Sequence, residues 1–412
     1  MNLKLRNYVD EIVSSTIADI QVDKLVRKAL ANCQFPKQVK VIAIGKAAWQ
    51  MAKSVSDVLG DTISSGIVIT KYEHCKGDIP NFECYEAGHP ILDENSIKAT
   101  NKVIELVSKS NEKEYVLFLV SGGGSALFES PLVSLDELQS INNQLLRCGA
   151  SIDEINTIRK RLSAVKGGKF AQLCYPAQVH SIILSDVLGD KLDVIASGPS
   201  CVDVSTCIEA VEIVERYNLN ISQKAKDCLN IETPKELANI SHEIIGSVKE
   251  LCQVCATHCE RLGFETIILT DCYDGEAREL GRFLGASAKS NCHSNKKLAF
   301  VAGGESVVHL TGNGLGGRNQ ELALGATISI SSIPNVCVFS LGSDGTDGPT
   351  EAAGGYVDGD TASELASYDI SISDVLSNND AYHALKKVNG LLITGPTGTN
   401  VNDVSVVLID AE

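Results

Sequence analysis

Two aspartates and five glycines follow the apolar run Val336–Leu341, in the stretch SLGSDGTDGPTEAAGG that covers residues 340–355. Carboxylates at the end of a strand can bind a metal ion or accept a proton, and glycines let the backbone approach a ligand closely. We therefore expect Asp344 and Asp347 to contact a ligand or metal, or to include a catalytic base. A surface turn, which uses the same residue types, is the alternative.

A second glycine-rich loop, SGGGSA at residues 121–126, lies between an apolar strand and an expected helix. The successive residues Gly122, Gly123 and Gly124 allow backbone N–H groups to converge on an anion, and the helix dipole adds to the attraction. We expect this loop, with Ser125, to bind nucleotide or substrate. It is not a Walker A loop, because no GK[ST] follows, and a tight turn is the alternative.

Two further loops follow strands in the first half of the chain. SDVLGD, at residues 185–190, carries Asp186 and Asp190, which are candidate Mg²⁺ ligands, with Asp186 also a candidate base; helix capping is the alternative. Lys46 opens a helix directly after a strand, where its charge opposes the helix dipole. That position is favourable if an anion also binds there, and a solvated lysine is the alternative.

The stretch GNGLGGRNQE, at residues 312–321, contains a GxGxxG match and precedes a helix. A dinucleotide-binding loop would place an acidic residue about 20 positions further on, and Asp344 lies too far along the chain to fit. The turn is also more polar than that motif requires, since it carries Arg318, Asn319 and Glu321. We interpret Arg318 as a bidentate clamp for a carboxylate or phosphate, with Asn319 and Glu321 beside it in the binding site.

The last glycine-rich loop, GPTGTNVND, covers residues 395–403. Thr397 and Asn400 supply neutral hydrogen-bonding groups for a ligand, and Asp403 is a cap or a contact. His89, in the tripeptide GHP, is an acid–base candidate, although we favour a packed histidine. Together, backbone anion cradles, isolated cations and strand-end carboxylates suit phosphoryl transfer, which depends on positioning and charge neutralisation.

The elements that position these loops alternate between strand and helix. Apolar runs feed glycine-rich turns and then helical segments, which predicts α/β structure with a Rossmann-like parallel sheet in the first half. Such sheets bind ligands at the carboxyl ends of their strands. We expect two α/β domains, residues 1–235 and 236–412, with a cleft between them. In the second half, residues 306–310 are expected to form a hairpin strand.

The composition restricts the class of protein. The chain has 412 residues, 44% of them hydrophobic, and a formal net charge of −16 without a dense basic cluster, so a nucleic-acid partner is not expected. No apolar run reaches the roughly 18 residues of a membrane span, and the N-terminus resembles an amphipathic helix more than a signal peptide. The 14 cysteines are scattered. We expect a cytoplasmic protein with no membrane partner and with reduced thiols.

The chain resembles the class II glycerate kinases, ATP-dependent glycerate 2-kinases whose C-terminal half is called the MOFRL domain. The resemblance is carried by GKAAWQMA, VSGGGSALFESP, INTIRKRLSAVKGGKFA, LSDVLGDKLDVIASGPS, GGRNQELAL, GSDGTDGPTEAAGG and GPTGTNVNDV, which run in family order from about residue 40 to the C-terminus. It implies an N-terminal kinase domain, a C-terminal MOFRL domain, and transfer of the ATP γ-phosphoryl group to the 2-hydroxyl of D-glycerate with Mg²⁺. It also implies functional importance for Lys46 and Arg318.

Two departures from the family pattern stand out. Arg161 replaces an expected histidine in RKRLS, and Ser306 replaces an expected threonine in GGES. If the histidine contacts the ligand in the family, specificity differs here. The alternatives to the kinase are an NAD(P)H-dependent hydroxypyruvate reductase and a non-catalytic protein that binds a sugar acid or nucleotide. The sequence leaves open the acceptor, the identity of the base, and whether the chain forms a homodimer.

Overall fold

The computed structural model describes residues 1–35 and 38–411, which form two compact units. The N-terminal unit comprises Leu25–Ile245, and the C-terminal unit comprises Met1–Lys24 together with Gly246–Glu412. Both are built from strands and helices, which confirms the predicted α/β class. The predicted cleft between two domains stays a prediction.

The N-terminal unit contains a six-stranded sheet of order β3-β2-β1-β4-β5-β6. The pairings β3–β2, β2–β1, β1–β4 and β4–β5 are parallel. This is the strand order of a doubly wound sheet. From β1, the next two strands are added on one side and the later strands on the other side, so the order of the strands reverses between β1 and β4. The strands are β1 Val39–Ile44, β2 Ile63–Lys71, β3 Phe82–Ala87, β4 Tyr115–Val120, β5 Gln178–Leu184 and β6 Ile240–Gly246.

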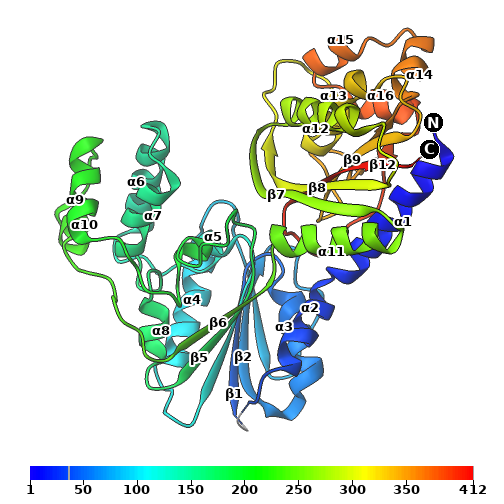
Figure 1. The fold of residues 1–412 in the computed structure, drawn as a ribbon. Coiled ribbons are helices and arrows are strands. Elements are labelled where there is room, and N and C mark those ends of the chain that lie inside the picture. The colour runs from blue at the N-terminus through cyan, green and yellow to red at the C-terminus, as the bar shows by residue number, and fades with distance from the viewer. Residues whose placement is uncertain (36–37, 412) are drawn as a thin grey trace. The chain divides into compact units, whose positions relative to one another are not determined.

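Helices cover both faces of this sheet (Figure 1). One face packs against α4 and α8 through Phe118, Val103 and Phe170, and the other carries α2 and α3. Four more helices, α6, α7, α9 and α10, share a separate apolar cluster that includes Leu145, Ile158 and Ile213. The bounds are α2 Val22–Ala31, α3 Ala48–Leu59, α4 Glu94–Val107, α5 Gly124–Leu127, α6 Leu135–Arg147, α7 Ile152–Arg161, α8 Lys169–Cys174, α9 Cys207–Arg216 and α10 Gln223–Leu229, with short 3₁₀ turns at Gly60–Thr62 and Ile195–Ser197.

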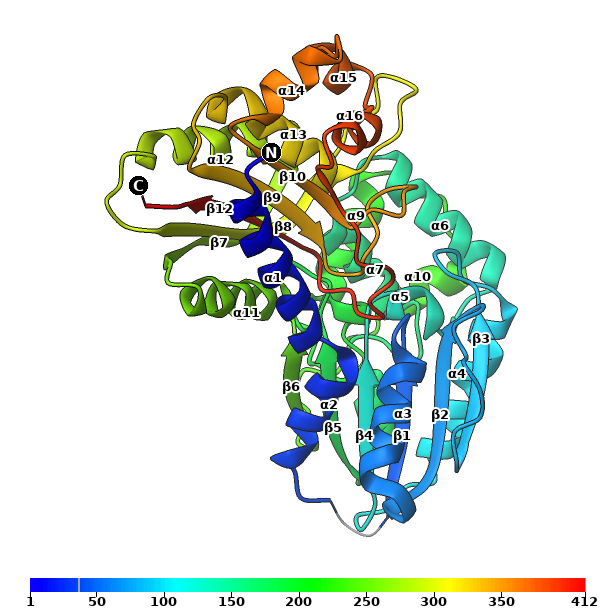
Figure 2. The ribbon, with the colours of Figure 1, turned by 90° about the vertical axis from the view of Figure 1, so that its right-hand side faces the viewer.

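The C-terminal unit contains a mixed sheet of order β11-β10-β9-β12-β8-β7 (Figure 2). The last strand, β12, is fully buried in the middle of the sheet and is antiparallel to both β8 and β9. As a result, the carboxyl ends of β8 and β9 meet the start of β12. The strands are β7 Glu265–Glu276, β8 Leu298–Val307, β9 Val336–Gly342, β10 Gly354–Asp358, β11 Leu391–Leu392 and β12 Asp403–Ile409.

The expected hairpin strand over residues 306–310 is wrong. Ser306 and Val307 instead continue β8, where they pair in parallel with Gly275 and Glu276 of β7. The reason is that β7 continues beyond its apolar residues as far as Glu276. Its last residues therefore pair with a β8 that is longer than expected. Beyond Val307 the chain leaves the sheet and forms the loop that leads to α13.

Among the described residues, the helices that belong mainly to the C-terminal unit are α1 Leu3–Asp19, α11 Val248–Arg261, α12 Ala277–Asn291, α13 Arg318–Ile330, α14 Thr361–Ser367, α15 Ile372–Ser377 and α16 Ala381–Lys387. Helix α1 is held in this unit by contacts with residues that lie far along the chain. The backbone N–H of Asn2 donates to Asp358 at 2.6 Å, and Arg6 donates to the carbonyl of Asn389 at 2.8 Å and stacks on Tyr356. In the described part of the chain, none of the helices has both the length and the hydrophobicity of a membrane span.

The units divide the chain differently from the expected domains, residues 1–235 and 236–412. A cut after residue 235 would remove β6 from the edge of the N-terminal sheet. The expected division assigns α1 to the N-terminal domain, whereas α1 packs on α11 and β9 in the structure. An amphipathic helix at a terminus does not reveal which apolar surface it covers, so the sequence could not assign it.

Candidate active site

The first group of predicted residues lies at the carboxyl ends of β1, β4 and β5, where the order of the N-terminal sheet reverses. The loop after β1 is bound to the loop after β4: the backbone N–H of Lys46 donates to the carbonyl of Gly122 at 2.8 Å. The Ser121 hydroxyl accepts from the N–H of Ala47 at 3.1 Å and donates to the carbonyl of Ile44 at 3.1 Å. These bonds hold the Lys46 backbone beside the glycine loop.

The glycines of this loop allow close approach by functional side chains. A Cβ at Gly122 would lie 2.0 Å from Oδ2 of Asp186, so that carboxylate rests against the loop backbone. A Cβ at Gly123 would lie 2.9 Å from the His89 ring and 3.3 Å from Cγ of Lys46, and its φ of +88° also favours glycine. The structure therefore gathers Lys46, Asp186 and His89 around Gly122 and Gly123.

His89, for which packing is the favoured prediction and acid–base chemistry the alternative, lies next to the glycine loop. The ring is half-buried against Gly123, and burial, followed by the charge of Lys46, lowers the pKa of His89 below its usual value. The imidazole is therefore neutral at pH 7 and can accept a proton. A single histidine in a loop carries no signal of this position, which depends on the contact between segments far apart in the sequence.

The helix expected after the glycine loop is a single turn, α5, so its dipole contributes little. Ser125 on this turn lies 3.4 Å from the Ser197 hydroxyl, which donates to Asn156 at 2.9 Å. Ala196, Ser197 and Gly198 all have positive φ, between 51° and 64°. Consecutive left-handed residues are strained, which is typical of functional loops.

Two basic side chains that the sequence analysis did not select support the same turn. Lys166 donates to the carbonyl oxygens of Ser125 and Phe128 at 2.9 and 3.0 Å, and complete burial lowers its pKa to about 8. Arg159 lies 3.5 Å from the Ser125 carbonyl, and burial lowers the pKa of this arginine as well. Both come from the basic stretch INTIRKRLSAVKGGKFA.

Asp186 and Asp190 are the predicted Mg²⁺ ligands. Both are half-buried in one turn after β5, where the N–H of Asp190 donates to the carbonyl of Val187 at 3.1 Å and Asp190 has a φ of 52°. Two carboxylates that complete their coordination with phosphate oxygens are the donor set that Mg²⁺ prefers. The Asp186 carboxylate lies against the backbone of Gly122, where a Cβ would meet its Oδ2 at 2.0 Å, and the binding of Mg²⁺ by Asp186 and Asp190 stays a prediction.

The second group lies in the C-terminal unit, around the start of α13. Arg318 contacts Asp403 through two nitrogen–oxygen pairs and Glu305 through a third at 2.8 Å. Asp403 pairs in the sheet with Gly304 on one side and Gly342 on the other, which places it between the two strand ends. Burial alone would lower the pKa of Arg318, but Asp403 and Glu305 raise it above its usual range.

Asp347 caps helix α13. Its Oδ1 accepts from the backbone N–H of Asn319 at 3.1 Å, and its Oδ2 accepts from the backbone and side chain of Gln320 at 2.9 and 3.0 Å. The side chain of Asn319 also contacts Asp347, at 3.3 Å, and accepts from Ser340 at 2.5 Å. Asn319 and Asp347 are thus engaged inside the unit, and their contact with a ligand stays a prediction.

Glu321 is buried on α13 in a similar way. Its Oε1 accepts from Arg278 at 2.9 Å and its Oε2 accepts from Asn379 at 3.2 Å. Burial raises the pKa of Glu321 above its usual value. Its predicted role in ligand binding also stays a prediction.

The two C-terminal glycine-rich loops contact each other. The N–H of Thr397 donates to the carbonyl of Asp344 at 3.1 Å, and its hydroxyl donates to the carbonyl of Ser343 at 2.6 Å. The Asp344 carboxylate accepts from Thr346 at 2.9 Å and is half-buried, as is Asn400. The structure therefore brings Asp344, Thr397 and Asn400 to neighbouring loops at the same end of the sheet as Arg318.

The GxGxxG glycines have partners within the protein. A Cβ at Gly312 would lie 2.4 Å from Asn378, one at Gly314 would lie 2.5 Å from Asp380, and one at Gly317 would lie 2.3 Å from Asp347. The glycine spacing is thus explained by close packing on the segment between α15 and α16 and on the α13 cap. The match therefore lends little support to dinucleotide binding.

Arg161 is remote from these loops. It is buried in the group of helices and donates to the carbonyl of Ser205 at 2.7 Å and to Glu232 at 3.2 Å, with Asp203 at 3.5 Å. Where the family pattern has histidine, this chain therefore places an arginine that ties α7 to the segment before α9. A direct effect of Arg161 on specificity has no support in these contacts.

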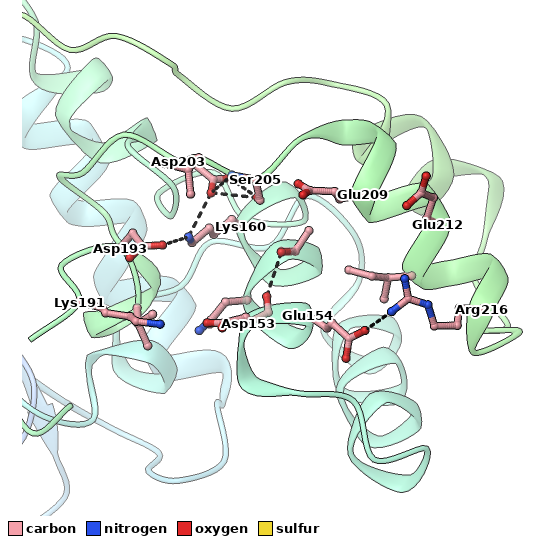
Figure 3. Close-up of a pocket in the computed structure, with 15 residues that line it drawn as sticks. Asp153, Glu154, Lys160, Lys191, Asp193, Asp203, Ser205, Glu209, Glu212 and Arg216 are labelled. Atoms are coloured by element: carbon pink, nitrogen blue, oxygen red, sulfur yellow. Dashed lines mark hydrogen bonds and ion pairs between the residues drawn. The ribbon is translucent and has the colours of Figure 1, made fainter. Parts of the chain in front are cut away.

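A cavity of about 550 Å³ lies next to this cluster, between α7, α9 and residues 191–205 (Figure 3). Lys160 pairs there with Asp193 and Asp203, both at 3.1 Å, and Arg216 pairs with Glu154 at 2.6 Å. The residues predicted for the site do not line it. Lys160 and Arg216 are paired with carboxylates of the protein, and most of the charged side chains in the lining are acidic, which does not favour an anionic ligand.

The chain is similar to known proteins in both sequence and structure. A family model described as a domain of unknown function, DUF4147, matches residues 8–230, and the MOFRL family model matches residues 298–403. A D-glycerate 2-kinase of Thermotoga maritima is 50% identical over 98% of each chain. A protein of Agrobacterium vitis, provisionally described as a hydroxypyruvate reductase, is 35% identical over 98% of this chain and 94% of its own. The crystal structure of a glycerate kinase from T. maritima superposes with a TM-score of 0.96 at 50% identity, covering 98% of this chain and 99% of that one.

Proposed function

The chain belongs to the family of glycerate 2-kinases with a C-terminal MOFRL domain, and from this premise we propose that it transfers the γ-phosphoryl group of ATP to the 2-hydroxyl of D-glycerate. In this reaction the hydroxyl oxygen attacks the γ-phosphorus, the bond to the β–γ bridging oxygen breaks, and the hydroxyl proton passes to a base. The products are 2-phosphoglycerate and ADP.

The observation that carries the proposal is the junction of Lys46, Gly122 and Asp186 at the reversal point of the N-terminal sheet. The backbone N–H of Lys46 donates to Gly122 at 2.8 Å, Asp186 approaches the same glycine, and Cγ of the Lys46 side chain would lie 3.3 Å from a Cβ at Gly123, which supports a site that uses a lysine, a glycine loop and a carboxylate together. This is the position at which doubly wound sheets bind their ligands. The chain has a net charge of −16, which repels anions in general. A lysine at this position, Lys46, would provide the local positive charge that an anionic substrate needs.

The residues of this junction have complementary tasks in the proposed reaction. Lys46 neutralises charge on the phosphates, and the N–H groups of Gly122, Gly123 and Gly124 with the Ser125 hydroxyl bind phosphate oxygens. Asp186 and Asp190 would hold Mg²⁺, which supplies further neutralisation of phosphate charge when bound. His89, held neutral beside Gly123, joins Asp186 and Asp344 as a candidate acceptor of the hydroxyl proton.

Arg318 is proposed to bind the carboxylate of glycerate or a phosphate group. Asp403 fixes the plane of its guanidinium, while Glu305, which is 46% exposed, occupies the remaining Nη1 donor. An incoming anion can displace an exposed carboxylate at little cost, because an exposed ion pair contributes only about 0–1 kcal/mol. Asp344, Thr397 and Asn400 contribute from the neighbouring loops.

The test is an assay with ATP, Mg²⁺ and D-glycerate that measures ADP release and identifies the product by coupling to enolase. Enolase consumes 2-phosphoglycerate directly, whereas 3-phosphoglycerate would first require a mutase. We expect a signal that is lost in Lys46→Ala and in Arg318→Ala and kept in Lys98→Ala, an exposed lysine on α4. Folded protein that releases no ADP with glycerate would refute the proposal, and oxidation of NADH or NADPH by hydroxypyruvate would replace it with the reductase.

A further inference from the structure

Three potential metal ligands meet at the edge of the N-terminal sheet, outside the candidate active site. Cys33 follows α2, His180 lies on β5 and Glu243 lies on the edge strand β6 (Figure 2). Their ligand atoms all lie within 4.8 Å of one another. Within the described residues, this is the one group of three or more His, Cys, Asp or Glu side chains arranged in this way. We propose that Cys33, His180 and Glu243 bind a Zn²⁺ ion.

The distances are close to those of a tetrahedral zinc site. Cys33 Sγ lies 3.8 Å from His180 Nε2, and Nε2 lies 3.9 Å from Glu243 Oε2. Zinc bonds of about 2.3 Å to sulfur and 2.0–2.2 Å to nitrogen and oxygen place such neighbours about 3.4–3.6 Å apart. The Glu243 side chain is 37% exposed and is therefore free to move the last few tenths of an ångström.

The histidine is oriented for ligation by its other ring nitrogen. His180 Nδ1 lies 2.8 Å from the hydroxyl of Ser241, which is two residues before Glu243 on the same side of β6. With the ring proton on Nδ1, the hydroxyl accepts it and the Nε2 lone pair faces the thiol and the carboxylate. Metal-bound histidines are held by such a second hydrogen bond in most proteins.

The segment that carries the thiol is fixed against the sheet. Phe35 packs edge-on against Tyr115 of β4 with ring centroids 5.6 Å apart, and the Cys33 thiol contacts the carbonyl of Ala29 at 3.5 Å. Burial and the nearby Glu243 raise the pKa of Cys33, so the thiol is protonated until a cation neutralises the site. Binding would then release that proton, as thiolate ligation requires.

The donor set selects the metal. One thiolate, one imidazole and one carboxylate suit zinc, with a fourth position for water, whereas Mg²⁺ prefers oxygen ligands alone. His180 lies near the amino end of β5, while Asp186 follows its carboxyl end. The site therefore joins α2, β5 and β6 structurally and does not act on the substrate of the proposed kinase.

The chain contains a matched control pair. Cys201 Sγ lies 3.3 Å from His242 Nε2, but that nitrogen also meets the carbonyl of Ser200 at 2.9 Å. Cys201 and His242 form a hydrogen-bonded pair without the three-ligand geometry. Cys201→Ser thus removes a thiol beside a histidine and leaves the proposed zinc ligands in place.

The experiment uses full-length protein stripped with EDTA and then titrated with Zn²⁺ alone, against a chromogenic chelator. We expect one tight equivalent per chain and a rise in the unfolding midpoint of at least about 3 °C. Affinity should fall at least 100-fold in Cys33→Ser and in His180→Ala, and roughly 10–100-fold in Ser241→Ala. Cys201→Ser should bind as the wild type does.

Cobalt provides a second readout. Co²⁺ in the site should give a thiolate-to-metal charge-transfer band that disappears in Cys33→Ser and persists in Cys201→Ser. Equal zinc binding by the wild type and Cys33→Ser would overturn the proposal, and so would a cobalt complex without the thiolate band. Because the band reports ligation directly, the result does not depend on stability or on kinase activity.

Discussion

Arg318 and Asp403 meet through two nitrogen–oxygen contacts, Nε to Oδ2 at 2.7 Å and Nη2 to Oδ1 at 3.1 Å. Asp403 is 2% exposed at the start of β12, whereas the Arg318 side chain is 31% exposed at the start of α13. The buried carboxylate therefore orients the guanidinium while the side facing Glu305 stays accessible. This arrangement supports the proposal that Arg318 binds an anion, and mutation of Arg318 can test the two contacts with Asp403.

Replacing Arg318 with lysine tests that geometry. A lysine keeps the charge but presents a single ammonium group, so it cannot hold Asp403 through two contacts and bind a second anion in a fixed plane. We expect kcat/KM for phosphorylation of glycerate to fall at least about 100-fold, which corresponds to roughly 2.7 kcal/mol of lost transition-state stabilisation. Glu305→Gln is the control, and it should retain activity. A fully active lysine variant would show that charge alone suffices.

The same pair should make stability depend on pH. Burial raises the pKa of Asp403 to about 7 despite the opposing effect of Arg318, while an unfolded aspartate titrates near about 3.9. Between these values the native state binds more protons than the unfolded state, so the free energy of unfolding should decrease as pH rises from about 4 to about 7. In Asp403→Asn this decrease should be smaller. Urea unfolding at several pH values measures the difference, and parallel curves would contradict the assignment.

Asp347 should matter for stability because it caps α13. Asp347→Ala would leave the N–H groups of Asn319 and Gln320 without their acceptor, and we expect a loss of about 1–3 kcal/mol in the free energy of unfolding. Urea unfolding provides the measurement. Asp347→Asn keeps one acceptor oxygen and should lose less. Unchanged stability in the alanine variant would mean that water replaces the cap.

Asp344, in contrast, should matter for turnover. Its carboxylate is half-buried and accepts from Thr346 within its own loop. If it binds metal or takes the hydroxyl proton, Asp344→Asn should reduce kcat at least about 100-fold and leave the unfolding midpoint nearly unchanged. Steady-state kinetics with ADP detection makes the comparison. Near-normal turnover would identify this loop as a surface turn.

Gly122→Ala tests the close approach of Asp186. The new Cβ would lie 2.0 Å from the carboxylate oxygen, so Asp186 or the loop must move by about an ångström. Such a displacement can reduce activity roughly 100-fold. Gly316→Ala is the matched control, because its Cβ would find an ordinary contact at 3.4 Å. Equal activity of the two variants would indicate that Asp186 is not required in that position.

Much of the fold could be predicted from local pattern. The apolar runs of β1 and β9 are buried along their lengths and that of β4 is buried after its first residue, and the glycine-rich stretches follow them as loops. The carboxyl ends of parallel strands share one edge of a sheet, so Lys46, the glycine loop and Asp186 could be expected to lie together. The residue types needed for phosphate binding follow from charge and backbone freedom, which are properties of the sequence.

The tertiary structure decided which polar side chains form hydrogen bonds within the protein. Asp347 and Glu321, predicted to bind ligand, are hydrogen-bonded around α13, and His89 reaches Gly123 from a distant loop. The insertion of β12 between β8 and β9 brings Asp403 to Arg318, and α1 packs with the C-terminal unit. These outcomes depend on contacts between residues far apart in the chain. The sequence by itself determined the elements and the chemistry of their loops, whereas long-range packing decided which side chains meet.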